Sequence, residues 1–283
     1  MPLVSLYVPG DRPERFAKAV AAGADEVIID LEDAVSADRK DFARSAVADF
    51  LAPSRPEPSL SRPEPVEGPI SVRPNAAGTS WQDADLAMLA AADGLSSVRL
   101  PKAEGPETID AVRQVITNPE VVINCLLETA LGVEQAYAIA GHPDVASISL
   151  GEADLRAELG ITSEAGMDWI RVRTVVAARA AGLPAPMMAV YPHVSDIDGL
   201  ERSCRAGAAL GFVGRTAIHP RQIEVIRRAF QPTAAEIEYA EEVLEVLEAG
   251  YGAAVLADGR MVDAAMAVEA RRILARTTGM TES

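Results

Sequence analysis

Residues 121–155 read VVINCLLETALGVEQAYAIAGHPDVASISLGEADL and contain two short apolar runs, each with an acidic residue shortly after its end. The first run covers residues 121–127 and is followed by Glu128, and the second covers residues 145–150 and is followed by Asp154. Short apolar runs bounded by polar and turn residues are typical of buried parallel strands, and residues 131–140 between them have helical spacing. We therefore expect two successive parallel strands that carry Glu128 and Asp154 to the same end of a sheet.

The two carboxylates suggest a metal site. Oxygen ligands suit a hard divalent cation, and with two protein ligands Mg²⁺ would keep water or substrate in its remaining positions. Either acid alone could instead cap a helix or lie in a solvated loop. Because both follow successive strands, we predict that Glu128 and Asp154 bind Mg²⁺.

Strand-like and helix-like segments alternate on both sides of this stretch. Eight runs are expected to form strands, each followed by a helical pattern: residues 3–8, 26–31, 69–72, 97–100, 121–127, 145–150, 187–191 and 212–213. Eight such units predict an α/β fold, a (β/α)8 TIM barrel over residues 1–230. In that fold the polar residues that follow the strands face one pocket at the C-terminal mouth.

Composition limits the partners and the location. The chain has 283 residues, 49% of them hydrophobic, and a formal net charge of −16. This charge argues against nucleic acid or an anionic membrane surface as the main partner. The two cysteines, Cys125 and Cys204, have no metal or disulfide spacing, and we find neither an apolar stretch of about 18 residues nor a signal-peptide pattern. We expect a soluble cytoplasmic protein with no membrane partner.

Three acids follow the second expected strand: Asp30, Glu32 and Asp33. They could surround a metal, supply a general base or cap the next helix. Among them, Asp33 is a candidate catalytic residue and Glu32 a candidate substrate contact.

Two cations follow the third and fourth strands. The planar guanidinium of Arg73 suits a substrate carboxylate, although a salt bridge to a neighbouring acid is the alternative. Lys102 is one of only three lysines. It could form a Schiff base, but we favour a point charge for substrate or nearby acids, because the metal pair offers another electrophile. His193 and His219 are expected to be hydrogen-bonding scaffold residues.

Two segments do not fit the alternation. Residues 53–68 contain Ser-Arg-Pro-Glu-Pro twice, which predicts an extended insertion on the face opposite the active site; a Pro-rich docking ligand is the less favoured reading. Residues 231–283 form a C-terminal extension with an acidic amphipathic helix and, at Asp258-Gly259, a hairpin turn.

Eight motifs resemble the citrate lyase beta subunit-like proteins, within the wider group of magnesium-dependent 2-oxo-acid aldolases and malyl- or citramalyl-CoA lyases. They are VPGDRP at 8–13, DLEDAV at 30–35, VRPN at 72–75, LPK at 100–102, LETALGV at 127–133, GEADL at 151–155, IHP at 218–220 and DGRMVD at 258–263. The resemblance covers the chain except residues 53–68. Two departures are Val4, where most relatives have Arg, and Pro74, where an aliphatic residue is usual.

The resemblance implies a TIM barrel, usually a homotrimer or hexamer, that cleaves or forms the bond between an acyl-CoA and a 2-oxo acid. Glu128 and Asp154 match the magnesium ligands, and Arg73 matches the substrate-binding arginine. Asp263 matches a catalytic aspartate that the C-terminal extension lends, as a lid, to a neighbouring subunit. In such a reaction Mg²⁺ polarises the developing carbonyl, Arg73 offsets oxyanion charge and Asp263 moves the proton.

Three hypotheses remain open at this point. The leading one is a stand-alone magnesium-dependent lyase for a malyl-CoA or citramalyl-CoA type thioester, with a thioesterase on the same scaffold as a variant. The second is a citrate lyase beta subunit, which would need acyl-carrier and transferase partners. The third is a non-catalytic protein that has kept the barrel, and the set of charged residues argues against it.

Overall fold

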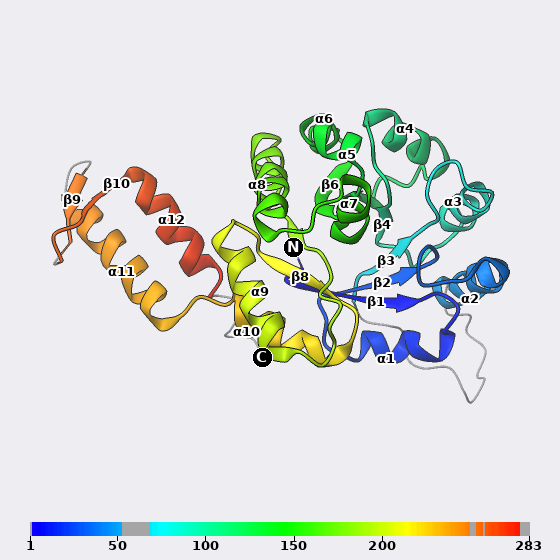
Figure 1. The fold of residues 1–283 in the computed structure, drawn as a ribbon, viewed down its shortest axis with the longest axis horizontal. Coiled ribbons are helices and arrows are strands. Elements are labelled where there is room, and N and C mark those ends of the chain that lie inside the picture. Colours follow the sequence, from blue (N-terminus) through cyan, green and yellow to red (C-terminus); the bar gives the residue numbers. More distant parts are fainter. Residues whose placement is uncertain (1, 53–67, 250–252, 257, 278–283) are drawn as a thin grey trace. The chain divides into compact units, whose positions relative to one another are not determined.

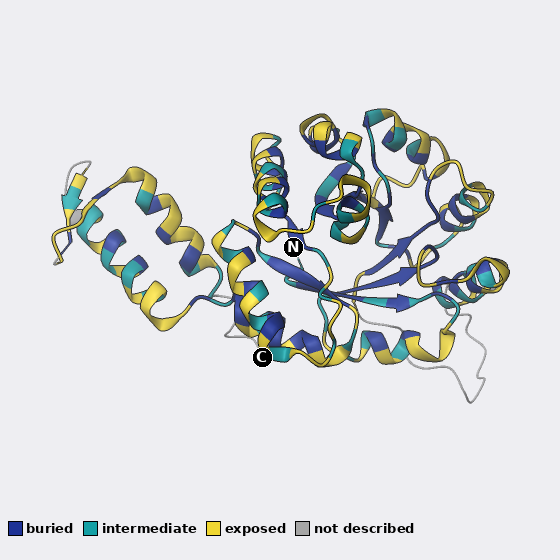
Figure 2. Cartoon of the chain, in the orientation of Figure 1, coloured by how far each residue is buried: buried dark blue, intermediate teal, exposed yellow. Residues whose placement is uncertain are grey.

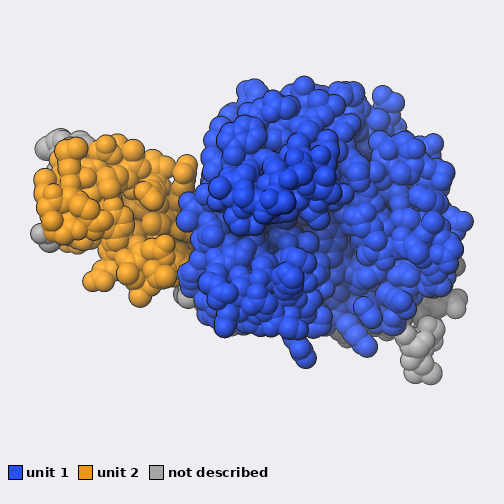
Figure 3. Space-filling view, viewed as in Figure 1, with its two compact units in different colours: residues 1–229 blue, residues 230–283 orange. Residues whose placement is uncertain are grey.

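The computed structural model describes residues 2–52, 68–249, 253–256 and 258–277. These fall into two compact units, Met1–Ala229 and Phe230–Ser283 (Figure 3). Of the expected Pro-rich insertion, residues 53–67 lie outside the described residues.

The first unit contains a parallel barrel (Figure 1). Its eight described strands run in the order β6-β5-β4-β3-β2-β1-β8-β7, and every pairing between them is parallel. Within the described residues β6 and β7 share no ladder, yet they are close neighbours, so the barrel is nearly closed. The strands are β1 Val4–Pro9, β2 Glu26–Asp30, β3 Ile70–Arg73, β4 Ser97–Leu100, β5 Val122–Leu127, β6 Val145–Leu150, β7 Met187–Met188 and β8 Gly214–Ala217. The predicted TIM-like α/β fold is confirmed.

Helices cover the outside of the barrel, and the strands between them are almost wholly buried (Figure 2). Burial of branched aliphatic side chains from both the strands and the inner faces of the helices forms the core. The helices are α1 Phe16–Val20, α2 Lys40–Leu51, α3 Gln82–Ala90, α4 Pro106–Val115, α5 Ala130–Glu134, α6 Ala136–Ala140, α7 Glu152–Leu159, α8 Glu164–Ala180, α9 Ile197–Ala209 and α10 Ile223–Phe230, with 3-10 turns at η1 Pro13–Arg15, η2 Ala37–Arg39 and η3 Pro220–Gln222.

Two predicted strands are misplaced. The run 187–191 pairs only at Met187–Met188, and the carbonyl of Tyr191 accepts instead from the side chain of Gln222. The strand expected at 212–213 begins at Gly214, where an added Cβ would lie 2.1 Å from the Leu3 carbonyl oxygen. Close backbone approach, which only glycine permits here, sets the start of β8 and is invisible to an apolar pattern.

The second unit is a small helical hairpin with its own core. Helix α11 (Ala234–Ala249) and helix α12 (Ala264–Ala275) pack together, and β9 (Ala253–Val255) pairs antiparallel with β10 (Met261–Asp263). Gly259 has a φ of 88°, so the predicted turn at Asp258-Gly259 is confirmed. The buried core residues are Ala240, Val243, Leu256, Val262, Ala270 and Ile273. No helix in the described part of the chain has the length and apolar character of a membrane span.

Candidate active site

The C-terminal ends of β2 to β5 bring most of the predicted site residues together. Asp30 ends β2 and pairs in register with Arg73, which ends β3. Lys102 follows β4 and Glu128 follows β5 directly. Because parallel strands end at the same edge, four segments distant in sequence deliver charged side chains to one mouth of the barrel.

Arg73 is the most heavily engaged of these side chains. Its Nε donates to Asp30 Oδ1 at 2.8 Å and its Nη2 to Asp30 Oδ2 at 2.6 Å, a bidentate pair. Its Nη1 lies 3.1 Å from both Glu32 Oε2 and Asp33 Oδ2. Burial works against the charge, but the hydrogen bonds and charge of Asp30 outweigh it and raise the pKa of Arg73. The salt-bridge alternative is therefore present in this structure, and any substrate would meet an arginine already oriented by three acids.

The loop after β2 is held in place from beneath. Asp30 accepts the backbone N–H of Glu32 at 2.8 Å and of Ala34 at 3.0 Å. Lys40, which is 7% exposed, donates to the carbonyl oxygens of Leu31 and Glu32, each at 2.7 Å. These bonds fix the backbone that presents Glu32 and Asp33 to Arg73.

Lys40 also joins this loop to the segment after β3. Its Nζ donates to Asn75 Oδ1 at 2.6 Å, while Asp85 Oδ2 accepts both the backbone and the side-chain N–H of Asn75. Arg44 Nε in turn donates to Asp85 Oδ1 at 2.7 Å. A continuous buried network therefore connects the arms that carry Glu32 and Arg73.

Our sequence reasoning missed Lys40, Asn75 and Asp85. One signal was available for Lys40, because it shares the buried face of α2 with Ala43, Val47 and Leu51. A lysine on the apolar side of a helix requires buried acceptors. Nothing in the pattern identified those acceptors as loop carbonyls.

Glu128 is buried at 2% exposure and contacts Lys102. Its Oε1 accepts the backbone N–H of Lys102 at 2.9 Å and lies 4.0 Å from Lys102 Nζ. Among the described residues, Lys102 is the one non-glycine residue with a positive φ, 47°. This uncommon backbone conformation accompanies the bond from its N–H to Glu128, and such strain is often kept at functional sites.

Lys102 has the character of a charge rather than a nucleophile. Its Nζ lies 3.5 Å from Glu32 Oε1. Burial lowers its pKa, but the charges of Glu32, Glu128, Asp154 and Asp33 more than offset this and raise it. A protonated ammonium cannot attack a carbonyl, so the geometry favours the point-charge interpretation over the Schiff base.

The charge balance of this mouth fits a divalent cation. Five carboxylates (Asp30, Glu32, Asp33, Glu128 and Asp154) interact with three cations (Arg73, Lys40 and Lys102). Burial, followed by the charge of Glu32, raises the pKa of Glu128 to about 8, and Asp154 contributes in the same direction. With all five carboxylates ionised the mouth would have two surplus negative charges. Mg²⁺ would neutralise them after displacing the proton that Glu128 holds below its pKa, and carboxylate oxygens are its preferred protein ligands.

Gly151 makes room for this arrangement. A Cβ built there would lie 2.5 Å from both Cβ and Oε2 of Glu128, so a side chain would displace the carboxylate. Four residues after β6 ends, Asp154 lies half-buried in the first turn of α7. Within residues 2–52, 68–249, 253–256 and 258–277, no group of three or more His, Cys, Asp or Glu side chains is arranged to hold a metal, and metal binding by Glu128 and Asp154 stays a prediction.

The remaining predicted residues are placed differently. Asp33 is exposed at the mouth, and His219 Nδ1 accepts the N–H of Arg221 at the start of η3, a scaffold contact. Asp263 belongs to the second unit. There its Oδ1 accepts the N–H groups of Ala265 at 2.9 Å and Met266 at 3.3 Å, which caps α12. Its catalytic role stays a prediction.

Known proteins are similar to this chain in sequence and in fold. Over 280 residues the chain is 35% identical to a (3S)-malyl-CoA thioesterase from Cereibacter sphaeroides, covering 96% of this chain and 93% of that protein. It is 32% identical over 302 residues to a mitochondrial citramalyl-CoA lyase from Rattus norvegicus, covering 98% of this chain and 86% of that protein. The solved structure of protein CitE from Mycobacterium tuberculosis, in complex with magnesium, acetoacetate and coenzyme A, has a TM-score of 0.82 and 35% identity, and each chain is 97% covered.

The match to the family extends over almost the whole barrel. Residues 3–220 fit the family described as HpcH/HpaI aldolase/citrate lyase. These residues include the ends of β2 to β6 and the start of α7, where the charged mouth is built. The chain belongs to the HpcH/HpaI aldolase/citrate lyase family.

Proposed function

We propose that this protein is a magnesium-dependent carbon–carbon lyase. Its substrate would be a 2-hydroxy-acid acyl-CoA thioester, such as malyl-CoA or citramalyl-CoA, and its products an acyl-CoA and a 2-oxo acid, with the reverse condensation also possible. The observation that carries the proposal is the buried Glu128, with Asp154 acting on its pKa, at a mouth where five carboxylates face three cations. The relatives named above, and the magnesium and coenzyme A bound to one of them, support the substrate class.

The chemistry needs three things from the site. The substrate hydroxyl must lose its proton, the emerging 2-oxo acid must be held, and the enolate left on the acyl group must be stabilised. A magnesium ion held by Glu128 and Asp154 would supply Lewis-acid polarisation of the developing carbonyl. Lys102 and Arg73 provide positive charge beside it, where oxyanion charge develops in a partly dry mouth.

The proton carriers are proposed to be Asp33 and Asp263. Asp33 is exposed at the mouth and its Oδ2 lies 3.1 Å from Arg73 Nη1, so it is open to solvent while Arg73 orients it. Asp263 would act in the pocket of a neighbouring subunit of a homotrimer or hexamer, with residues 231–283 serving as the lid and residues 1–230 as the catalytic barrel. The soluble enzyme would work in the cytoplasm.

Product analysis separates the lyase from its nearest alternatives. Purified protein with Mg²⁺ is incubated with malyl-CoA, citramalyl-CoA and related thioesters, and free thiol and 2-oxo acid are both followed. Release of 2-oxo acid without thiol supports the lyase. Thiol without 2-oxo acid would instead assign a thioesterase, the activity named for the Cereibacter sphaeroides relative. Co-purification of an acyl-carrier partner with activity only on a carrier-bound citryl thioester would assign a citrate lyase beta subunit.

A mixing experiment tests the shared site. Asp263→Asn should keep its cap and its substrate binding but lose turnover, whereas Glu128→Gln should lose metal binding. Co-assembled mixtures of the two inactive variants would contain some pockets with both residues intact, so activity should reappear and be greatest at equal amounts. If subunit exchange is verified and activity stays at zero, Asp263 does not act across an interface.

A further inference from the structure

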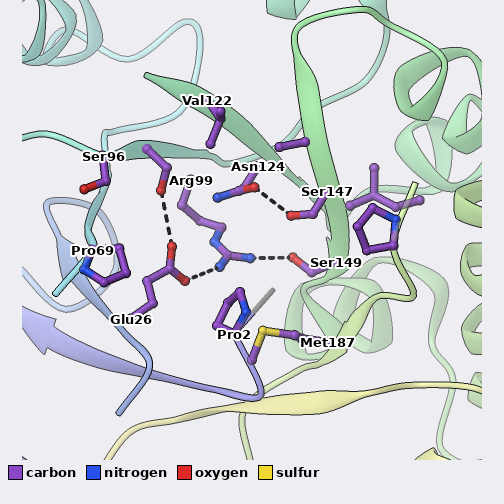
Figure 4. Close-up of a pocket in the computed structure, with 14 residues that line it drawn as sticks. Pro2, Glu26, Pro69, Ser96, Arg99, Val122, Asn124, Ser147, Ser149 and Met187 are labelled. Carbon is purple, nitrogen blue, oxygen red and sulfur yellow. Dashed lines mark hydrogen bonds and ion pairs between the residues drawn. The ribbon is translucent and has the colours of Figure 1, made fainter. Parts of the chain in front are cut away.

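A second polar pocket lies at the opposite end of the barrel from the charged mouth. Its volume is about 330 Å³, and Figure 4 shows the side chains that line it. Glu26 is the first residue of β2, whereas Asp30 at the charged mouth is the last. The other polar lining residues come from β4, β5 and β6, or directly precede β4: Ser96, Ser97, Arg99, Asn124, Ser147 and Ser149.

The carboxylate and amide oxygens of this pocket already accept hydrogen bonds. Glu26 Oε2 accepts from Ser5 Oγ at 2.7 Å and from Arg99 Nη2 at 3.2 Å, and its Oε1 accepts from Ser97 Oγ at 3.2 Å. Asn124 Oδ1 accepts from Ser147 Oγ at 2.7 Å. Three hydrogen bonds therefore engage the carboxylate of Glu26, and its charge is offset by one guanidinium.

Some hydrogen-bond donors of the pocket lining have no partner. Arg99 is 3% exposed and has five N–H groups, of which one reaches Ser149 and one reaches Glu26. Its Nε is buried, has no hydrogen-bond partner in the described part of the chain and is closed to a ligand, so the donors left for one are the second N–H groups of Nη1 and Nη2. The Asn124 amide adds two further N–H groups, and the bonds described for this side chain involve its oxygen alone. A buried arginine with unused donors faces the cavity, and leaving such donors unpaired costs free energy.

The rest of the lining is apolar. Pro2, Pro69, Pro184, Val122 and Met187 surround the polar centre, as Figure 4 shows for the labelled members of this set. An acceptor that satisfies Arg99 and Asn124 would thus bring its remaining atoms against hydrocarbon. This combination selects an organic acid over an inorganic ion, because the latter has no apolar part to bury.

We propose that this pocket binds a small organic carboxylate, with the carboxylate oxygens on Arg99 and Asn124 and the hydrocarbon part against the proline and methionine rim. The site is independent of the proposed lyase chemistry, since it uses none of the residues of the charged mouth. Three strands that line it, β2, β4 and β5, also lead to Asp30, Lys102 and Glu128.

The test uses butyrate as the probe and inorganic phosphate as its comparison, both titrated into the full-length protein by calorimetry in excess EDTA. The chelator removes metal-dependent binding at the charged mouth. Butyrate should bind the wild type at least about tenfold more tightly than phosphate, a difference expected from burying its hydrocarbon part. Absence of butyrate binding, or phosphate binding of equal strength, would overturn the proposal.

Two substitutions at Asn124 locate the binding. Asn124→Asp keeps the acceptor for Ser147 and adds a carboxylate beside Arg99, so the fold is retained while the anion is repelled. Asn124→Leu removes the amide donors without adding charge. Both should weaken butyrate binding at least about tenfold, whereas Glu128→Gln at the other mouth should leave it unchanged. Unaltered binding in both Asn124 variants, or its loss in Glu128→Gln, would place the probe elsewhere and refute the assignment.

Discussion

At each end of the barrel a buried arginine pairs with an acid of β2, Arg73 with Asp30 and Arg99 with Glu26. The two ends nevertheless differ in charge balance. At the C-terminal end Arg73 is shared by Asp30, Glu32 and Asp33, and Glu128 and Asp154 add two more acids. At the N-terminal end Arg99 meets one acid, Glu26, which serines help to satisfy. An acid surplus in a partly dry mouth requires a cation, whereas a balanced pair is stable without one.

The difference shows why similar ion pairs serve different purposes. A buried pair whose opposite charges match contributes little beyond its own desolvation cost, and its loss is felt as lost stability. Acids held close together without enough partners raise one another's pKa and bind metal or protons readily. The C-terminal end should therefore respond to substitution mainly in activity, and the N-terminal end mainly in stability.

The largest effect is expected from Glu128→Gln. The amide keeps the shape of the side chain but removes the charge proposed to hold Mg²⁺, so turnover should fall by about a thousandfold, the range found when one preorganised electrostatic group is lost. Lyase assays over a magnesium titration measure this, and circular dichroism checks the fold. The exposed Glu120 supplies a matched control, Glu120→Gln, which should be silent. Full turnover of the wild type in excess chelator would remove the metal from the mechanism.

Arg73→Met and Arg99→Met compare the two ends directly. Each leaves buried acid unpaired, so both should lose about 3–5 kcal/mol of unfolding free energy in urea melts. Only Arg73→Met should also lower turnover, by about a hundredfold, because its charge is proposed to offset the substrate oxyanion. Equal losses of turnover in the two variants would mean that activity follows stability alone, and the functional contrast between the ends would fail.

Magnesium binding should strengthen as the pH rises toward 8. Burial and the charge of Glu32 raise the pKa of Glu128 to about 8 in the metal-free protein, from an ordinary value of 4.5. Between pH 4.5 and about 8, Glu128 keeps a proton in the folded state that it has lost in the unfolded chain. The free energy of unfolding of the metal-free protein therefore falls as the pH rises through this range. Mg²⁺ must displace that proton, and its apparent affinity should gain about tenfold per unit up to the pKa. The magnesium-induced shift in Tm measures this at several pH values, and a pH-independent shift would contradict it.

Lys40→Met tests the network beneath the mouth. Without the ammonium, the carbonyl oxygens of Leu31 and Glu32 lose their partner, and the loop that carries Asp33 can move. We expect kcat to fall about tenfold, the lower range for residues that orient a metal site, with a smaller change in KM. The exposed Lys18 offers the control Lys18→Met. If both lysine variants retain wild-type kcat, the network does not position the site.

The smallest effect is expected from Ser149→Ala at the N-terminal end. It removes the hydroxyl that accepts from Arg99 at 3.0 Å, so unfolding free energy should fall by about 1 kcal/mol. Turnover should stay at the wild-type level, since no catalytic group is touched. Urea denaturation and the lyase assay are run on the same preparation. If turnover falls by more than the loss of folded protein accounts for, the N-terminal end is coupled to the reaction.

Local pattern alone determined the barrel and much of its charged mouth. Short apolar runs that alternate with segments of helical spacing predict a parallel α/β fold. Because parallel strands share a direction, that fold places Arg73, Lys102 and Glu128 at one end of the barrel. The hairpin at Asp258-Gly259 was equally predictable, because the turn needs a positive φ. These features depend on residues close to one another in the chain.

Tertiary structure decided which charges meet. The Asp30 pair with Arg73 spans 43 residues, the Lys40 bond to Asn75 spans 35, and the Arg99 bond to Glu26 spans 73. No periodicity encodes such contacts, because they depend on strand register and on which face of α2 packs against the sheet. The partners in turn set whether a carboxylate is balanced, as Glu26 is, or left in surplus, as at Glu128. The sequence therefore supplied the charged groups, and the packing of distant strands determined their electrostatic environment.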